Sequence, residues 1–185
     1  MTNNRIKIRP LRPDELKAFW QLAFSNPNAE WTKWNGPYFH DQLPTKIDFL
    51  TNIGPSDWLN NDYRWVITLD QQLVGALFAY FDDGNLKRWL DIGITIYPDE
   101  AWGNHIGSTA LKLWIDHLFT DVTQLPHIGF TTWSGNKRMM ALGDRIGMKL
   151  EGQIRQVRYW QGQYYDSIKY GILKKEWKKM ASNEK

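Results

Sequence analysis

A glycine-containing turn at Trp102–Gly107 is the stretch of this sequence best suited to binding an anion. It follows a strand-like segment that ends at Tyr97 and a break at Pro98, and it opens a helical pattern that reaches Phe119. The first N–H groups of a helix have no intrahelical acceptor, and the helix dipole adds positive character at the same end. Such a turn suits a phosphate. The alternative is an ordinary strand-to-helix turn, and the sequence has neither a P-loop G-K-[ST] pattern nor G-x-G-x-x-G.

Asp91 is the candidate for proton transfer because it lies in the middle of a predicted strand. Along this strand Asp91 shares one face with Gly93 and Thr95, whereas Leu90 and Ile92 lie on the other. An acid on that face fits a cleft better than a core, so its carboxylate could take part in proton transfer. The alternative is a carboxylate that pairs with a nearby Arg or Lys.

Two further groups could contact a ligand. Asn136 stands at the predicted start of a helix, where it could hydrogen-bond a ligand or simply act as an N-cap. The irregular segment 25–42 carries the aromatic residues Trp31, Trp34, Tyr38 and Phe39, which could form the wall of a cleft able to hold a cation. The alternative for this segment is a loop that plugs the edge of the core.

Composition narrows the class of protein. The chain has 185 residues, of which 42% are hydrophobic, enough for one domain with a substantial core. It has no cysteine, which excludes disulfides, cysteine metal sites and a cysteine nucleophile. No apolar run approaches membrane length, and a net charge of +3 is too small to indicate nucleic-acid binding. We therefore expect a cytoplasmic protein without membrane, nucleic-acid or metal partners.

The candidate residues for ligand binding and proton transfer must be positioned by the strands and helices of the fold. We expect strands at residues 5–11, 63–69, 73–81, 86–97, 127–133, 150–160 and 163–173. We expect helices from Pro13, from Pro44, from the glycine-containing turn and over 137–146, and after the last strand a short basic end at 174–180.

Three details of these helices can be checked. The Pro44 helix should turn Ile47 and Leu50 inward and stop at Gly54-Pro55. The helix after the turn should bury Ala110, Leu111, Trp114, Ile115 and Leu118. The chain should form a single domain over 1–185, with a frayed tail at 181–185. The fold class is α/β (α+β), with helices on both faces of a mixed, mostly antiparallel sheet of about seven strands.

Three segments at family spacing carry a resemblance to a known superfamily: YPDEAWGNHIGSTAL, the run from Asn136 through RIGMKLEGQIR, and QGQYYDSIKYGILKKEW. They resemble the GNAT superfamily of acetyl-CoA-dependent N-acetyltransferases, and most of all the branch that contains the ribosomal-protein N-terminal acetyltransferases. The likeness covers nearly the whole chain. It implies transfer of the acetyl group of acetyl-CoA to a primary amine, by direct attack in a ternary complex.

The resemblance also implies roles for individual residues. Backbone N–H groups of the turn would hold the pyrophosphate of coenzyme A, and the strand edge around Ile94 and Ile96 would align its pantetheine arm. The implied coenzyme-binding residues are Ile94, Ile96, Trp102, Gly103, Asn104, His105, Ile106, Gly107, Ser108 and Asn136. Asp91 and Asn136 are the implied catalytic residues, and we expect Trp31, Trp34 and Tyr38 to contact the acceptor amine.

The sequence departs from the family pattern at several of these positions. Trp102 stands where the family usually has Arg or Gln, and His105 stands where it prefers Gly. Met139 and Gly143 occupy positions where relatives carry a Ser or Tyr acid, which leaves Tyr97, Tyr164 and Tyr165 as proton donors or as packing residues.

The acceptor stays open between a protein N-terminus, an amino acid and a small amine. The final strands could pair across a homodimer. The alternative functions are a catalytically inactive binding module of the same fold, for coenzyme A or another ligand, and a basic RNA-associated protein.

Overall fold

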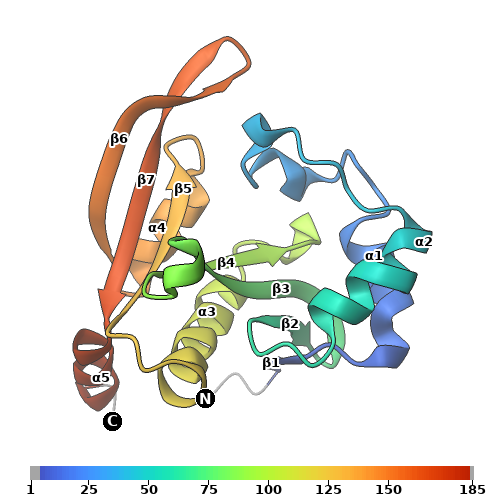
Figure 1. Ribbon diagram of the computed structural model, residues 1–185, viewed down its shortest axis with the longest axis horizontal. Coiled ribbons are helices and arrows are strands. Elements are labelled where there is room, and N and C mark those ends of the chain that lie inside the picture. The colour runs from blue at the N-terminus through green and yellow to red at the C-terminus, as the bar shows by residue number, and fades with distance from the viewer. Residues whose placement is uncertain (1–4, 184–185) are drawn as a thin grey trace. The chain divides into compact units, whose positions relative to one another are not determined.

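The computed structural model describes residues 5–183 (Figure 1). Its seven strands form a sheet in the order β1-β2-β3-β4-β5-β7-β6. The strands are β1 (Ile6–Pro10), β2 (Arg64–Leu69), β3 (Gln72–Phe81), β4 (Leu90–Ile96), β5 (His127–Trp133), β6 (Lys149–Trp160) and β7 (Gln163–Leu173). The helices are α1 (Leu16–Ala23), α2 (Lys46–Asp48), α3 (Ile106–His117), α4 (Lys137–Arg145) and α5 (Lys174–Asn183). The predicted α/β class and seven-stranded sheet are confirmed.

The chain divides into two compact units, each built from two separate segments. One unit comprises residues 1–78 and 94–114, and the other comprises residues 79–93 and 115–185. We call them the first and the second unit. Strands β3 and β4 contribute to both, so each unit has its own part of the sheet.

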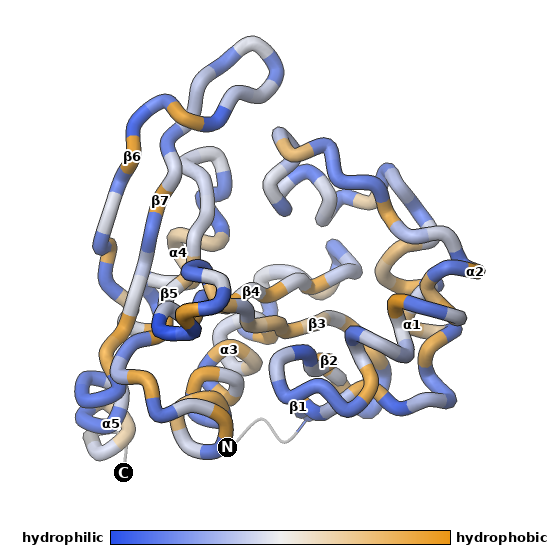
Figure 2. The backbone as a smooth tube through the Cα atoms, in the orientation of Figure 1, coloured by the Kyte–Doolittle hydropathy of each residue, from blue (hydrophilic) through white to orange (hydrophobic). Residues whose placement is uncertain are grey.

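The first unit contains strands β1 and β2, part of β3, and a large apolar cluster. β1 pairs with β2 and β2 with β3, both antiparallel, and the Tyr97 N–H donates to the Val74 carbonyl at the end of β4. The run of apolar residues along β3 is visible in Figure 2. Phe19 and Phe49 are fully buried in the core of this unit, with Trp58 and Tyr97 close to Phe19. This core supports the C-terminal end of β4.

In the second unit, the parallel pair of β4 and β5 is short. It joins Leu90 to Ile128 and Asp91 to Gly129, whereas β5 pairs antiparallel with β7 along its whole length. β6 completes this part as a long hairpin with β7, and α5 follows the end of β7 (Figure 1).

The helix after the glycine-containing turn matches its predicted apolar stripe. Ala110, Leu111, Trp114, Ile115 and Leu118 are all fully buried. Their spacing places them on one side of a 3.6-residue helix, so the sequence pattern was sufficient to identify this face.

The predicted helix from Pro44 is wrong in its start, its end and one inward residue. It begins at Lys46, where the Thr45 hydroxyl accepts the Asp48 N–H at 3.2 Å, and Ile47 is 77% exposed. It continues as a π-helical stretch, Phe49–Trp58, through Gly54 and Pro55. A Cβ at Gly54 would lie 2.7 Å from both the Phe49 carbonyl oxygen and a methyl carbon of Leu16. Gly54 therefore permits close packing against α1 and does not end the helix.

Two other boundaries differ from prediction. The strand expected from residue 86 begins only at Leu90, because Gly84–Leu86 forms a 3-10 turn and Lys87 adopts a left-handed conformation. At the C-terminus, residues 181–183 of the predicted frayed tail belong to α5, and residues 184–185 lie outside the described part.

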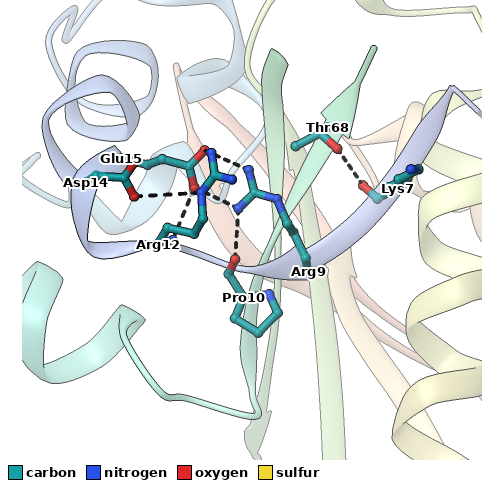
Figure 3. A network of polar contacts seen from close by, with 7 residues as sticks. All are labelled: Lys7, Arg9, Pro10, Arg12, Asp14, Glu15 and Thr68. Atoms are coloured by element: carbon teal, nitrogen blue, oxygen red, sulfur yellow. Dashed lines mark hydrogen bonds and ion pairs between the residues drawn. The ribbon is translucent and has the colours of Figure 1, made fainter. Parts of the chain in front are cut away.

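A network of charged hydrogen bonds ties β1 to the turn before α1 (Figure 3). The Arg9 guanidinium donates to both Glu15 carboxylate oxygens at 2.7 Å, and Arg12 donates to the same group at 2.8 Å. The Glu15 side chain is only 12% exposed. The hydrogen bonds from Arg9 lower the pKa of Glu15 below its ordinary value, against the opposing effect of burial.

We predict that Glu15→Gln destabilises the protein at pH 7 by about 1–3 kcal/mol, because it replaces a partly buried, doubly paired carboxylate. A carboxyl whose pKa is lowered by folding contributes stability above its unfolded pKa and loses it as the pH falls through the folded pKa. The difference between wild type and variant should therefore shrink in acid. Urea denaturation at a series of pH values measures it. Asp14→Asn, at a 77% exposed side chain near the same Arg12, is the control and should change little.

Candidate acetyl-transfer site

The glycine-containing turn of the first unit owes its shape to two left-handed residues. Gly103 has φ of +81° and His105 has φ of +60°, and α3 then begins at Ile106. The side chains of Asn104 and His105 are exposed, whereas Ile106 is 3% exposed and anchors the helix in the core. A left-handed residue favours glycine, which explains why a glycine would suit position 105. The turn is thus held at its helical end and open to solvent at its tip.

Trp102 fastens the turn to the end of β4. Its indole N–H donates to the Ile96 carbonyl at 2.8 Å, and its ring packs against the core of the first unit. Ile94 and Ile96 are half-buried. Trp102 therefore performs a structural task within the segment for which we predict coenzyme contacts. Its contact with a ligand stays a prediction.

The aromatic candidates for acceptor binding occupy different environments. Trp31, in the 3-10 turn Glu30–Lys33, is 7% exposed, and its ring lies 5.4 Å from that of Tyr97. Trp34 and Tyr38 are half-buried, and the Tyr38 ring lies 4.7 Å from that of Phe39. The core-plugging alternative describes Trp31 well, whereas Trp34 and Tyr38 keep accessible surface.

Asp91 lies in the second unit and is only 1% exposed. One carboxylate oxygen accepts the Thr131 hydroxyl at 2.8 Å, and the other accepts the Trp89 indole N–H at 3.1 Å. Burial raises the pKa of Asp91, while the Thr131 hydrogen bond and the nearby Lys169 cation oppose this effect. A raised pKa is what a general base near neutral pH requires. Asp91 receives its direct hydrogen bonds from a hydroxyl and an indole.

Asn136, also in the second unit, is the N-cap of α4. Its side-chain oxygen accepts the Met139 N–H at 3.1 Å, so the N-cap alternative applies to this oxygen. Gly143, in the same helix, leaves no room for a larger side chain. A Cβ at Gly143 would lie 2.8 Å from the Phe130 ring.

The tyrosines considered as proton donors also differ in environment. Tyr97 is 8% exposed, and burial strongly raises its pKa. Tyr164 is 64% exposed, and the Tyr165 hydroxyl donates to the Gln163 side chain at 3.2 Å. A raised phenol pKa makes Tyr97 a weaker acid than an ordinary tyrosine.

The sequence did not point to the residues that surround Asp91. Thr131 and Lys169 lie 40 and 78 positions further along the chain, on strands that only the fold brings to it. Trp89, two positions before Asp91 on one strand face, was the only neighbour that spacing could have identified.

Other classes of site can be checked within the described residues. Residues 5–183 contain no group of three or more His, Asp or Glu side chains that could hold a metal ion. No helix within that range has both the length and the apolar character needed to cross a membrane.

The sequence matches the Acetyltransferase (GNAT) domain over residues 5–149. The chain belongs to the GNAT acetyltransferase family. It is an acetyl-CoA-dependent N-acetyltransferase, and the recognition made from the three sequence segments is confirmed. No finding favours the catalytically inactive alternative.

Curated relatives and solved structures agree with this assignment. The protein named "Putative ribosomal N-acetyltransferase YdaF" from Bacillus subtilis (strain 168) is 27% identical over 180 residues, which cover 95% of this chain and 94% of the relative. The fold is similar to that of spermidine N-acetyltransferase from Vibrio cholerae in complex with CoA and spermine, with a TM-score of 0.73, 19% identity and coverage of 94% and 98%. It is also similar to RimL, a ribosomal L7/L12 alpha-N-protein acetyltransferase in complex with coenzyme A, with a TM-score of 0.72, 18% identity and coverage of 92% and 94%.

We predict that Gly103→Ala destabilises this GNAT enzyme by about 1–2 kcal/mol, because alanine strains at positive φ. A Cβ at Gly103 would meet no atom within 4 Å, so the effect isolates backbone strain from steric clash. Gly152→Ala is the matched control. Its Cβ would lie 3.8 Å from Lys169 Cβ, and no positive φ opposes it, so it should be neutral or stabilising. Thermal denaturation of both variants tests the difference, and equal melting temperatures would contradict it.

Proposed function

We propose that this enzyme acetylates the α-amino group at the N-terminus of a peptide or protein. The observation that carries the proposal is the match, over nearly the full length of both chains, to a relative named as a ribosomal N-acetyltransferase. A structural neighbour, a spermidine N-acetyltransferase, is in complex with spermine. The experiment must therefore distinguish a polyamine acceptor from a peptide acceptor.

The chemistry of the amine supports a peptide N-terminus. An α-amino group has a pKa of about 7.7–8.0, whereas an aliphatic amine has one of about 10.4. At pH 7 roughly one α-amine in ten is neutral, against about one aliphatic amine in 2,500. Removing a proton from a peptide N-terminus therefore costs a carboxylate base much less free energy than removing one from an aliphatic amine.

The charges near the residues proposed to bind the acceptor also favour a peptide N-terminus over a polyamine. Glu30, the acid beside Trp31, forms an ion pair with Lys33 at 2.5 Å. The chain carries a net charge of +3. A polycation would find a better partner in a cleft with surplus carboxylates.

The amine would attack the thioester directly. The chain contains no cysteine, so a cysteinyl-acetyl intermediate has no site. In this proposal backbone N–H groups from Gly103 to Ser108 bind the pyrophosphate of acetyl-CoA, and a backbone N–H near Ile94 or Ile96 polarises the thioester carbonyl. Asp91 accepts the amine proton, through water, and Asn136 contacts the pantetheine arm. The acceptor contacts Trp31, Trp34 and Tyr38.

Localisation and assembly belong to the same proposal. We infer a cytoplasmic enzyme that forms a homodimer, since the apolar surfaces of Ile154 and Tyr164 on the β6–β7 hairpin are 51% and 64% exposed. Light scattering of the purified protein measures the oligomeric state.

An acceptor panel tests the substrate class. We expect coenzyme A release with a peptide that has a free N-terminus, and none with the same peptide blocked by an N-terminal acetyl group. A lysine-free peptide removes side-chain amines, and mass spectrometry locates the added acetyl group. Faster turnover of spermidine than of any free peptide would contradict the proposal.

Gly107→Val tests the coenzyme site. Gly107 is half-buried in the first turn of α3, and a β-branched side chain there would obstruct a ligand that approaches the backbone N–H groups. We expect acetyl-CoA to bind at least about tenfold more weakly, or about 1.4 kcal/mol. Isothermal titration calorimetry measures the affinity, with Gly152→Val as the control for a glycine substitution elsewhere. Unchanged affinity in a folded Gly107→Val protein would remove the turn from the site.

A further inference from the structure

Lys169, in the second unit, contacts both residues that donate hydrogen bonds to Asp91. On β7, its ammonium group donates to the Thr131 hydroxyl at 2.9 Å and to the Asp82 carboxylate at 3.1 Å. It also lies 4.5 Å from the centroid of the Trp89 ring. Its side chain is 24% exposed, so the cation is held by three partners near the surface of the unit.

The hydrogen bonds that link Lys169, Thr131 and Asp91 can run in only one direction. A lysine ammonium has hydrogens to donate and no lone pair to accept, so the Thr131 oxygen must be the acceptor of Lys169. The single hydroxyl hydrogen of Thr131 is then left for Asp91, whose oxygen lies 2.8 Å away. Lys169 thereby orients the hydroxyl that stabilises the ionised form of Asp91.

Two charged groups of opposite sign act on Asp91. Lys169 favours the carboxylate and lowers its pKa, whereas Asp82, at the end of β3, disfavours the carboxylate and raises it. The groups that donate directly to Asp91 are uncharged: the Thr131 hydroxyl on β5 and the Trp89 indole just before β4. His127 on β5 is a further titratable group nearby, since a Cβ at Gly129 would lie 2.9 Å from an Asp91 carboxylate oxygen and 3.1 Å from the His127 ring, and His127 pairs with Glu151 at 2.8 Å. Asp82 also accepts a hydrogen bond from Lys169, so the two charged groups that act on Asp91 are in direct contact with each other.

The backbone leaves little freedom in this arrangement. Gly129 pairs with Asp91 across the parallel strands, and a Cβ there would lie 2.9 Å from an Asp91 carboxylate oxygen and equally close to the Tyr170 carbonyl. The carboxylate thus occupies space that any other residue at position 129 would fill. Glycine at this position therefore leaves room for Asp91 within the sheet.

We propose that Lys169 and Asp82 are positioning residues of the acetyl-transfer reaction, which act through Thr131 to set, in opposite directions, how tightly Asp91 holds a proton. The proposal rests on the proposed role of Asp91 as the base. Neither residue needs to touch the acceptor or acetyl-CoA.

The pH dependence of kcat/KM with one peptide acceptor tests the proposal. The acid limb of this profile is the fall in kcat/KM towards low pH, where Asp91 becomes protonated. Lys169→Met removes the cation and the orientation of Thr131, which raises the pKa of Asp91, so the acid limb should move to higher pH by about 0.5–1 unit. Asp82→Asn removes the opposing charge, so the limb should move to lower pH. The contribution of the amine is the same throughout, because the acceptor is unchanged. A purely structural role would lower activity or stability without moving the limb in opposite directions.

Control variants separate charge from packing. Thr131→Val should move the limb in the same direction as Lys169→Met, and Thr131→Ser should restore it, because serine keeps the hydroxyl. Lys178→Met, at an exposed lysine of α5, removes the same charge and should leave the limb unchanged. Carbon-13 NMR titration of the aspartate carboxyls gives a second readout that does not depend on turnover.

The outcomes distinguish this proposal from the one on which it rests. If Asp91→Asn leaves the acid limb as steep as in the wild type, Asp91 is not the base, and the proposal falls with it. If Asp91→Asn reduces the limb to the titration of the amine alone while Lys169→Met and Asp82→Asn leave it in place, the base stands and the positioning role is overturned. Opposite displacements, matched by the NMR titration of Asp91, are the expected result.

Discussion

A carboxylate removed from water must find its hydrogen-bond donors inside the protein, and this constraint organises the second unit around Asp91. The donors come from β5 and from the residue just before β4, and the compensating cation comes from β7. Burying an unpaired carboxylate would be far more costly than burying a leucine. The same burial that demands these donors also brings the proton affinity of the group towards neutral pH. The need for internal donors and the raised pKa of Asp91 therefore have the same origin.

Glycine solves two different problems in this fold. At Gly103 it supplies a backbone conformation that other residues adopt only under strain. At Gly54, Gly129 and Gly143 it supplies space, since a methyl group at each position would come within 3.0 Å of neighbouring atoms. The first kind of glycine can be recognised from its place in a turn. The second kind depends on partners that are distant in sequence, which is why Gly54 was mistaken for a helix stop.

The tryptophans show how aromatic residues near a candidate site divide between packing and recognition. Trp102 uses its N–H to bind the end of β4, and Trp31 is packed against Tyr97 in the core. Trp89 stabilises both a carboxylate through its N–H and a cation through its ring. In each case the indole stabilises the structure around a residue of the candidate site.

The sequence by itself determined the family, the α/β class, the succession of strands along the chain and the buried face of α3, because these follow from local periodicity, turn residues and short motifs. It also indicated Asp91 and the glycine-containing turn, whose roles in catalysis and coenzyme binding stay predictions. Tertiary structure alone decided which residues surround Asp91, since Thr131 and Lys169 reach it from strands distant in sequence. It likewise decided that Ile47 is exposed and that the α2 region passes through Gly54 and Pro55. Periodicity records which face of an element is apolar, but the partner of a side chain is set by strand order and register, which no local pattern encodes.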